Sequence, residues 1–270
     1  MEDVGRGGEL AQVAAERTAQ LIAAVRGLDD GALTAPSRLP GWSRLTIVCH
    51  LRYGASASLR MTEDTLAGRA TSYYPGGRAA QRPVTLRPGP GEQPRDVLDD
   101  WAEVAARLDR LWGLLDRDDW ALTITEPEAS TDLGPVPLAR LALARLTEVD
   151  VHGVDLDIGF PDWSEMLVDV ALPTRLAWLT TRRANDRAVD GSVQGSWLLV
   201  ADGFRWVVSV EGDQVTSAPA DRSTGRPRAT ISGTRRDVLA LLLGRRQHTS
   251  LEITGDVEFG ASFEQAFPGP

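Results

Sequence analysis

The chain has 270 residues, enough for one large domain or two modest ones, and its 42% of hydrophobic residues can supply a core for each. Its formal net charge of -9 argues against a nucleic-acid-binding protein, because phosphate binding relies on a cationic surface. No apolar run is long enough to cross a membrane, and the first residues lack the apolar core of a secretory leader, so neither is expected.

Cysteine and lysine usage narrows the chemistry further. The single cysteine, Cys49, excludes an internal disulfide and fits a reducing compartment, so we expect a cytoplasmic protein. Apart from three histidines, every basic side chain is arginine. A lysine Schiff base is therefore excluded, and a catalytic cation must be a guanidinium group or a metal ion.

The first half of the chain predicts helices, because its apolar residues recur at helical spacing. The first helix spans 9–28 and is interrupted by Gly31 and Pro36; the second begins after an N-cap at Ser43 and stops near Gly68. The stretch 71–94 is rich in glycine and proline and predicts a long loop without an element of its own. A third helix is expected over 95–115 and a fourth over about 137–158.

The pattern changes near residue 160. The segment 164–187 still predicts a helix, but alternating or β-branched runs then predict strands at 196–200, 204–210, 214–217, 228–232 and 250–254. A helix over 235–243 precedes the last strand, and 257–267 predicts one short closing helix. We therefore predict an α+β protein with two domains: a four-helix bundle at 1–160 and a smaller α+β domain at 161–270.

Two histidines lie on predicted bundle helices. His152 follows Glu148 by four residues, so both side chains project from one face of a helix and can bind the same ion, while His50 lies on the second helix. The alternative is a solvated helix face. A third ligand from a neighbouring helix would complete a site with one open position, which is typical of catalytic zinc, although nickel, iron or cobalt would also fit.

Cys49 is adjacent to His50, but consecutive helical residues point about 100° apart, so the two cannot face one ion. We interpret Cys49 as a small buried hydrophobic residue, and any thiol chemistry then needs an external thiol. His248 is expected on a surface loop. Asp155 orients a ligand imidazole, caps the helix or is exposed to solvent, and Trp42 is interpreted as an aromatic staple at a helix entry.

The arginines near the C-terminus have two interpretations. The side chains at 235, 236, 245 and 246 are either solvated or available to bind a carboxylate, which a guanidinium fork recognises well.

Several runs resemble a known family. These are 39–44 (LPGWSR), 48–51 (VCHL), Tyr74-Pro75 with Arg78, and 145–156 (RLTEVDVHGVDL). Together they resemble the mycothiol-dependent maleylpyruvate isomerase family, a branch of the DinB-like four-helix metalloproteins. The resemblance covers essentially the whole chain, since that family also carries a sterol-carrier-like α+β domain at its C-terminus.

The resemblance implies zinc held by His50, Glu148 and His152, and mycothiol as a thiol cofactor. The thiol would become a zinc-bound thiolate and add to the double bond of a small electrophile, which allows cis-trans isomerisation. A functional arginine of the family would correspond to Arg245, in a looser match because Arg246 follows directly.

Two other functions stay open at this point. The protein could be a mycothiol S-transferase that leaves the thiol on an electrophile, in detoxification or natural-product biosynthesis. It could also be a non-catalytic protein that binds a metal, a thiol or an apolar ligand. The expected partners are a small electrophile and mycothiol, without nucleic acid or membrane; the oligomeric state is not expressed in the sequence.

Overall fold

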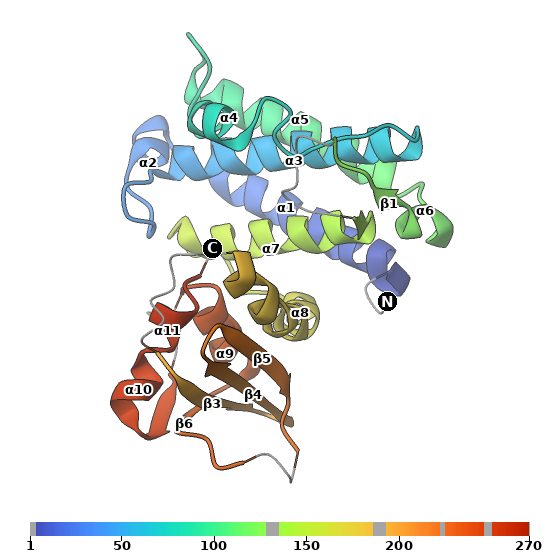
Figure 1. The fold of residues 1–270 in the computed structure, drawn as a ribbon. Coiled ribbons are helices and arrows are strands. Elements are labelled where there is room, and N and C mark those ends of the chain that lie inside the picture. Colours follow the sequence, from blue (N-terminus) through green and yellow to red (C-terminus); the bar gives the residue numbers. More distant parts are fainter. Residues whose placement is uncertain (1–3, 128–134, 186–192, 222–224, 246–249, 270) are drawn as a thin grey trace. The chain divides into compact units, whose positions relative to one another are not determined.

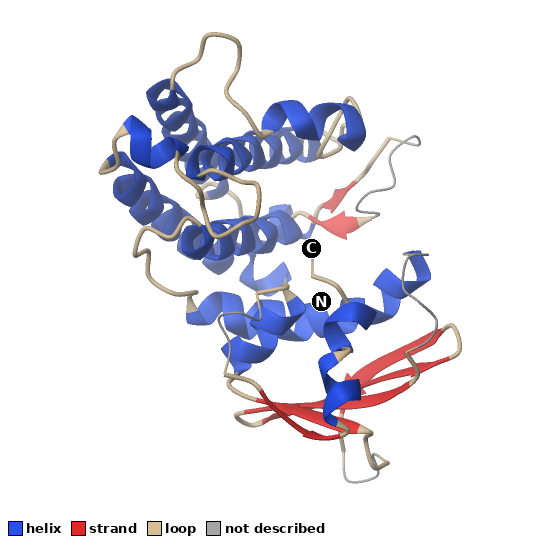
Figure 2. Ribbon diagram, turned by 90° about the vertical axis from the view of Figure 1, so that its left-hand side faces the viewer, coloured by secondary structure: helices blue, strands red, loops and turns tan. Residues whose placement is uncertain are grey.

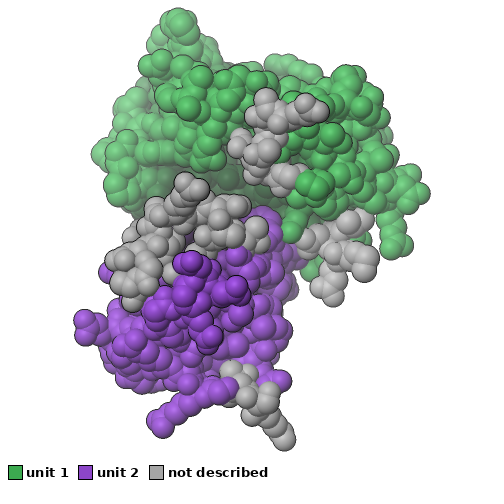
Figure 3. Space-filling view, in the orientation of Figure 1, with its two compact units in different colours: residues 1–167 green, residues 168–270 purple. Residues whose placement is uncertain are grey.

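The computed structural model describes residues 4–127, 135–185, 193–221, 225–245 and 250–269. The chain divides into two compact units, Met1–Leu167 and Val168–Pro270 (Figure 3). The first unit is helical and the second combines helices with a sheet, which confirms the predicted α+β class.

The long helices of the first unit form its core (Figure 1). They are α1 (Gly7–Arg26), α3 (Arg44–Leu66), α5 (Pro94–Trp112) and α7 (Ala139–Asp155). Shorter elements lie between or before them: the 3-10 helix η1 (Val4–Arg6), α2 (Asp30–Thr34), α4 (Arg78–Thr85), α6 (Arg117–Ala121), and the antiparallel strands β1 (Thr123–Ile124) and β2 (Val136–Pro137). In the bundle α3 packs against α5 and α7, and α1 packs against α5 and α7.

The predicted start of α3 is confirmed. The Ser43 hydroxyl accepts a hydrogen bond from the Thr46 amide, which satisfies one of the free N–H groups of the first turn. Apolar side chains spaced three or four residues apart, such as Val48, Leu51 and Ala55, are fully or almost fully buried. The apolar periodicity of the sequence therefore places the inner face of this helix correctly.

The prediction that 71–94 holds no element is wrong, because α4 forms in its middle. Gly77 has a φ of 84°, which favours glycine, and it turns the chain into the helix; the Gln81 amide then donates to its carbonyl. Pro83 lies inside α4, and none of the helix's side chains is buried. Neither property would lead one to predict a helix from the sequence, because proline removes a backbone hydrogen bond and the segment has no apolar face.

The second unit contains a five-stranded sheet (Figure 2), and the helix α8 (Glu165–Asn185) leads into it from the first unit. Its strands are β3 (Gly195–Ala201), β4 (Phe204–Glu211), β5 (Gln214–Pro219), β6 (Ala229–Ser232) and β7 (Glu252–Gly255), in the spatial order β5-β4-β3-β6-β7. Among the strands that the structure describes here, β3 and β6 pair in parallel and the other neighbours pair antiparallel. Each strand of this sheet corresponds to a predicted one, whereas β1 and β2 of the first unit were not predicted.

Helices of this unit pack on the sheet. They are α9 (Arg235–Leu242), α10 (Val257–Ala261) and α11 (Phe263–Ala266). The single closing helix predicted for 257–267 is wrong in detail, because Ser262 ends α10 and begins α11. Trp197 is the centre of the packing: it is fully buried, stacks on Phe259 at 4.3 Å, and donates its indole N–H to the Phe259 carbonyl.

No helix within the described ranges combines the length and the apolar character that crossing a bilayer demands.

Candidate metal centre

Three side chains from two helices of the first unit converge. Nε2 of His50 on α3 lies 2.6 Å from Oε2 of Glu148 on α7, and Nε2 of His152 lies 3.3 Å from the same oxygen. One potential ligand atom from each residue lies within 4.8 Å of the others. The structure thus brings together the three residues that the sequence singled out, at separations that a small cation could bridge.

The charges in this cluster are strongly coupled. Burial alone would raise the pKa of Glu148, but the neighbouring His50 and His152 hold it well below its ordinary range. Burial alone would lower the pKa of His152, but hydrogen bonds with Asp155 and Glu148 raise it to about 9. The cluster therefore stabilises positive charge beside an ionised carboxylate.

Asp155 orients one of the two imidazoles. Its carboxylate lies 3.0 Å from Nδ1 of His152 and is buried, so it favours a proton on Nδ1, and in the neutral imidazole this leaves the lone pair of Nε2 available to a metal ion. Orienting a ligand imidazole is one of the roles considered for Asp155 from the sequence. A carboxylate behind the histidine is the usual support of a metal-binding imidazole.

Trp42 lies beside both histidines. Its interpretation as an aromatic staple at a helix entry did not predict this position. Its ring is 5.7 Å from that of His50 and 6.1 Å from that of His152, nearly parallel to the latter. The turn that carries it is held against the end of α7, because the Arg38 amide donates to the Asp155 carbonyl. No local pattern could have shown the contact with His152, because it joins segments more than a hundred residues apart.

Cys49 is turned away from the cluster, as predicted. It is completely buried, and burial raises the pKa of its thiol to about 11 despite the opposing charge of Arg52. Its sulfur is not among the converging ligand atoms. A neutral, enclosed thiol of this kind behaves as a hydrophobic side chain.

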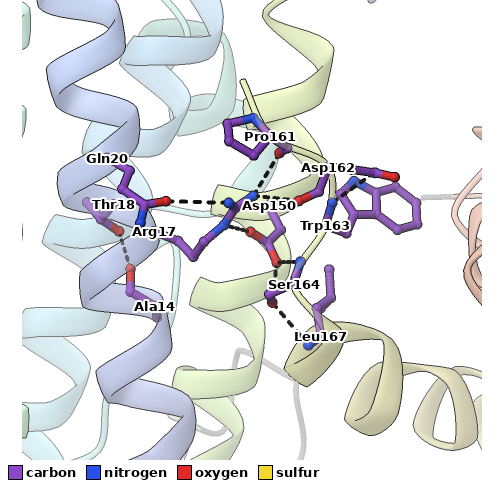
Figure 4. A network of polar contacts seen from close by, with 10 residues as sticks. All are labelled: Ala14, Arg17, Thr18, Gln20, Asp150, Pro161, Asp162, Trp163, Ser164 and Leu167. Carbon is purple, nitrogen blue, oxygen red and sulfur yellow. Dashed lines mark hydrogen bonds and ion pairs between the residues drawn. The ribbon is translucent and has the colours of Figure 1, made fainter. Parts of the chain in front are cut away.

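The opposite face of α7 carries a second charged group (Figure 4). Asp150 lies midway between the two α7 residues of the cluster and is fully buried, with its carboxylate paired to Arg17 of α1. The amide and hydroxyl of Ser164 donate to the same carboxylate, at 2.8 and 2.6 Å. Arg17 also donates to the carbonyls of Pro161 and Asp162. This network holds α7 in one rotational setting, with Glu148 and His152 facing α3.

A buried cation lies one helical turn before Glu148. Arg145 donates from Nη1 to the Leu51 carbonyl of α3 at 2.9 Å, which ties the two ligand-bearing helices together. Burial lowers the pKa of Arg145, while the charges of Asp109 and Glu148 oppose that shift. Its charge compensates part of the negative charge of Glu148.

Arg245 belongs to the second unit. It follows α9, donates its amide to the Ala240 carbonyl, and donates from Nη1 to the Leu243 carbonyl at 2.9 Å. Its functional role stays a prediction, since the two units are described separately. Arg246 and His248 lie outside the described residues. Arg235 forms an ion pair with Asp169 of the same unit.

A bundle whose facing helices bring two imidazoles and a carboxylate together is typical of helical proteins that hold a metal in their core. The sequence model of the mycothiol maleylpyruvate isomerase N-terminal domain matches residues 14–157, more than half of the chain. The chain belongs to this family, which confirms the resemblance seen in the motifs.

Solved structures agree with this assignment. A crystal structure of the mycothiol-dependent maleylpyruvate isomerase is similar with a TM-score of 0.64 at 20% identity, covering 92% of each chain. A mutant of the same isomerase gives a TM-score of 0.63, also at 20% identity and with 92% of each chain covered. At such identity the likeness establishes the fold. A search among curated proteins gives no match.

Proposed function

We propose that the protein is an enzyme of the maleylpyruvate isomerase type, which depends on a divalent metal, with zinc favoured, and on mycothiol. It would catalyse the cis-trans isomerisation of a small electrophile with an activated double bond. The observation that carries the proposal is the convergence of His50, Glu148 and His152, in a chain that belongs to the isomerase family.

The donor set fits a metal of this kind. Two imidazole nitrogens and one carboxylate oxygen match the preferences of zinc and of several other transition metals. Asp155 supports His152 from behind, and the cluster stabilises positive charge through the ionised Glu148. With three protein ligands, His50, Glu148 and His152 leave a coordination position open to a ligand from outside.

The chemistry divides between the bound groups and the chain. When bound, the metal supplies positive charge that favours the thiolate form of an incoming thiol. The thiol, by adding to the double bond and leaving again, supplies a single bond about which the substrate can rotate. Because Cys49 is enclosed and its thiol neutral, the chain itself offers no competing nucleophile of this type. In this proposal Arg245 binds a substrate carboxylate and stabilises the enolate-like charge that develops on addition.

The proposal also places the enzyme in the cytoplasm, where a thiol cofactor stays reduced and a lone cysteine is unremarkable.

The test is an assay of the purified protein with maleylpyruvate, in the presence and absence of mycothiol. We expect turnover only with the thiol, full recovery of free mycothiol at the end, and about one divalent ion per chain, as for a single metal site. Stoichiometric loss of mycothiol into a thioether would instead establish an S-transferase. Thiol-independent turnover, or metal-free protein with full activity, would refute the proposal.

A further inference from the structure

An arginine from α4 reaches the aromatic wall of the metal centre. The guanidinium carbon of Arg82 lies 5.9 Å from the centre of the Trp42 ring, and that ring contacts both His50 and His152. Two successive ring contacts therefore connect Arg82 to the candidate ligands. A flat aromatic face restricts the rotation of a guanidinium group and holds its edge in a defined direction.

Arg82 has no acidic partner among the residues that the structure describes. The helix α4 carries a second arginine, Arg78, and no acidic residue. The carboxylates of Glu92 and Asp100 on the following segment are engaged by Arg52. The side chain of Arg82 also donates no hydrogen bond within the described part of the protein, so the five N–H groups of its fork are available to a ligand.

We propose that Arg82 is a specificity-determining residue that binds a carboxylate of the electrophile while its double bond lies at the metal centre. This inference rests on the proposed function. A maleylpyruvate-like substrate carries a carboxylate at each end, so one arginine cannot hold both. A planar guanidinium fork placed over Trp42 suits the bidentate recognition of a second carboxylate.

The test compares two electrophiles that share a cis double bond and differ in charge. Maleylpyruvate is dianionic, whereas dimethyl maleate is uncharged. For Arg82→Gln with mycothiol we expect KM for maleylpyruvate to rise about tenfold or more, as expected on losing a charge-assisted pair. The kinetics with dimethyl maleate and the bound metal per chain should not change. Arg82→Lys keeps the charge but loses the planar fork, so its KM for maleylpyruvate should lie between those of the wild type and Arg82→Gln.

Arg87→Gln provides the matched control, because Arg87 is an exposed arginine close to α4 in sequence. This substitution should leave the kinetics with both electrophiles unchanged. A readout without turnover is calorimetric titration of the metal-loaded protein with succinate. We expect measurable binding to the wild type and to Arg87→Gln, and binding at least about five times weaker to Arg82→Gln, in line with the same lost pair.

The outcomes separate this inference from the proposed function. Unchanged KM for maleylpyruvate in Arg82→Gln, or equal succinate affinity in all three proteins, would overturn the role of Arg82 and leave the isomerase proposal intact. If the wild type turned over neither electrophile, the proposed function would fail, while the succinate titration would still decide whether Arg82 binds a carboxylate. An equal loss for the charged and uncharged electrophiles would also refute carboxylate recognition.

Discussion

The two faces of α7 each carry a carboxylate, but the two carboxylates differ in burial and in the partners that bind them. On one face Asp150 is fully buried and receives hydrogen bonds from Arg17 and Ser164, with permanent donors that stay in place. On the other face the side chain of Glu148 is 38% exposed, and its close partners are two imidazoles. An arginine cannot give up its proton, whereas a histidine can exchange its proton for a metal ion. The arrangement around Asp150 stabilises the fold, and the arrangement around Glu148 is suited to binding a metal ion.

The largest expected effect is on the binding face. His152→Ala should reduce the bound divalent metal from about one ion per chain to a trace, because two protein ligands no longer enclose the ion. The measurement is elemental analysis of the purified protein, with circular dichroism to show that the bundle is retained. Full metal content in this variant would contradict the proposed ligand set.

On the face that carries Asp150, the expected effect is on the free energy of unfolding. Asp150→Ala leaves the Arg17 guanidinium buried without its carboxylate, and breaking a buried pair in this way costs about 3–5 kcal/mol of unfolding free energy. Urea denaturation measures the loss. Asp99→Asn removes an exposed ion pair with Arg26 and serves as control, with little change expected. If Asp150→Ala unfolded like the wild type, the contrast between the two faces would be lost.

A smaller effect is expected for Asp155, which lies behind His152 on the binding face. Asp155→Asn should weaken metal affinity by roughly 10–100-fold, because the amide no longer holds and polarises His152 as a carboxylate does. Competition with a chelator of known affinity measures this change. Asp157→Asn alters an exposed carboxylate two residues further on, which pairs with Arg38, and should bind metal normally. Equal affinities for all three proteins would remove Asp155 from the metal centre.

A last prediction concerns Cys49, which belongs to neither charged group. Its raised pKa of about 11, two units above the ordinary value, lowers the thiolate fraction at pH 8 by about a hundredfold. Burial slows attack by a disulfide reagent further. Labelling of the folded protein should therefore be at least about a hundredfold slower than in denaturant. Rapid labelling of the native protein would show that this thiol is accessible. Cys49 could then act as the nucleophile itself, and the argument that the thiol must come from outside the chain would fail.

The parts that could be predicted from sequence are those set by local periodicity. Glu148 and His152 share one helix, so their spacing alone places both side chains on one face. His50 follows from the apolar pattern of α3. Arg17 and Asp150 are 133 residues apart, and no periodicity relates them. Their pairing depends on which face of α1 packs against α7.

The wall of the metal centre could not be predicted for a related reason. Trp42 is positioned by a turn whose backbone hydrogen bonds reach the end of α7. Arg82 lies on a helix that has no apolar face and contains a proline, so nothing in its sequence marks it as an element. These residues depend on tertiary contacts rather than on local propensity.

The exposed position of α4 has a consequence for how such proteins diverge. Because none of its side chains is buried, substitutions on this helix cost little folding free energy. The groups that would hold the metal lie on α3 and α7, where the packing tolerates few changes. Substrate preference could therefore drift by surface mutation on α4 while the reactive centre is inherited unchanged.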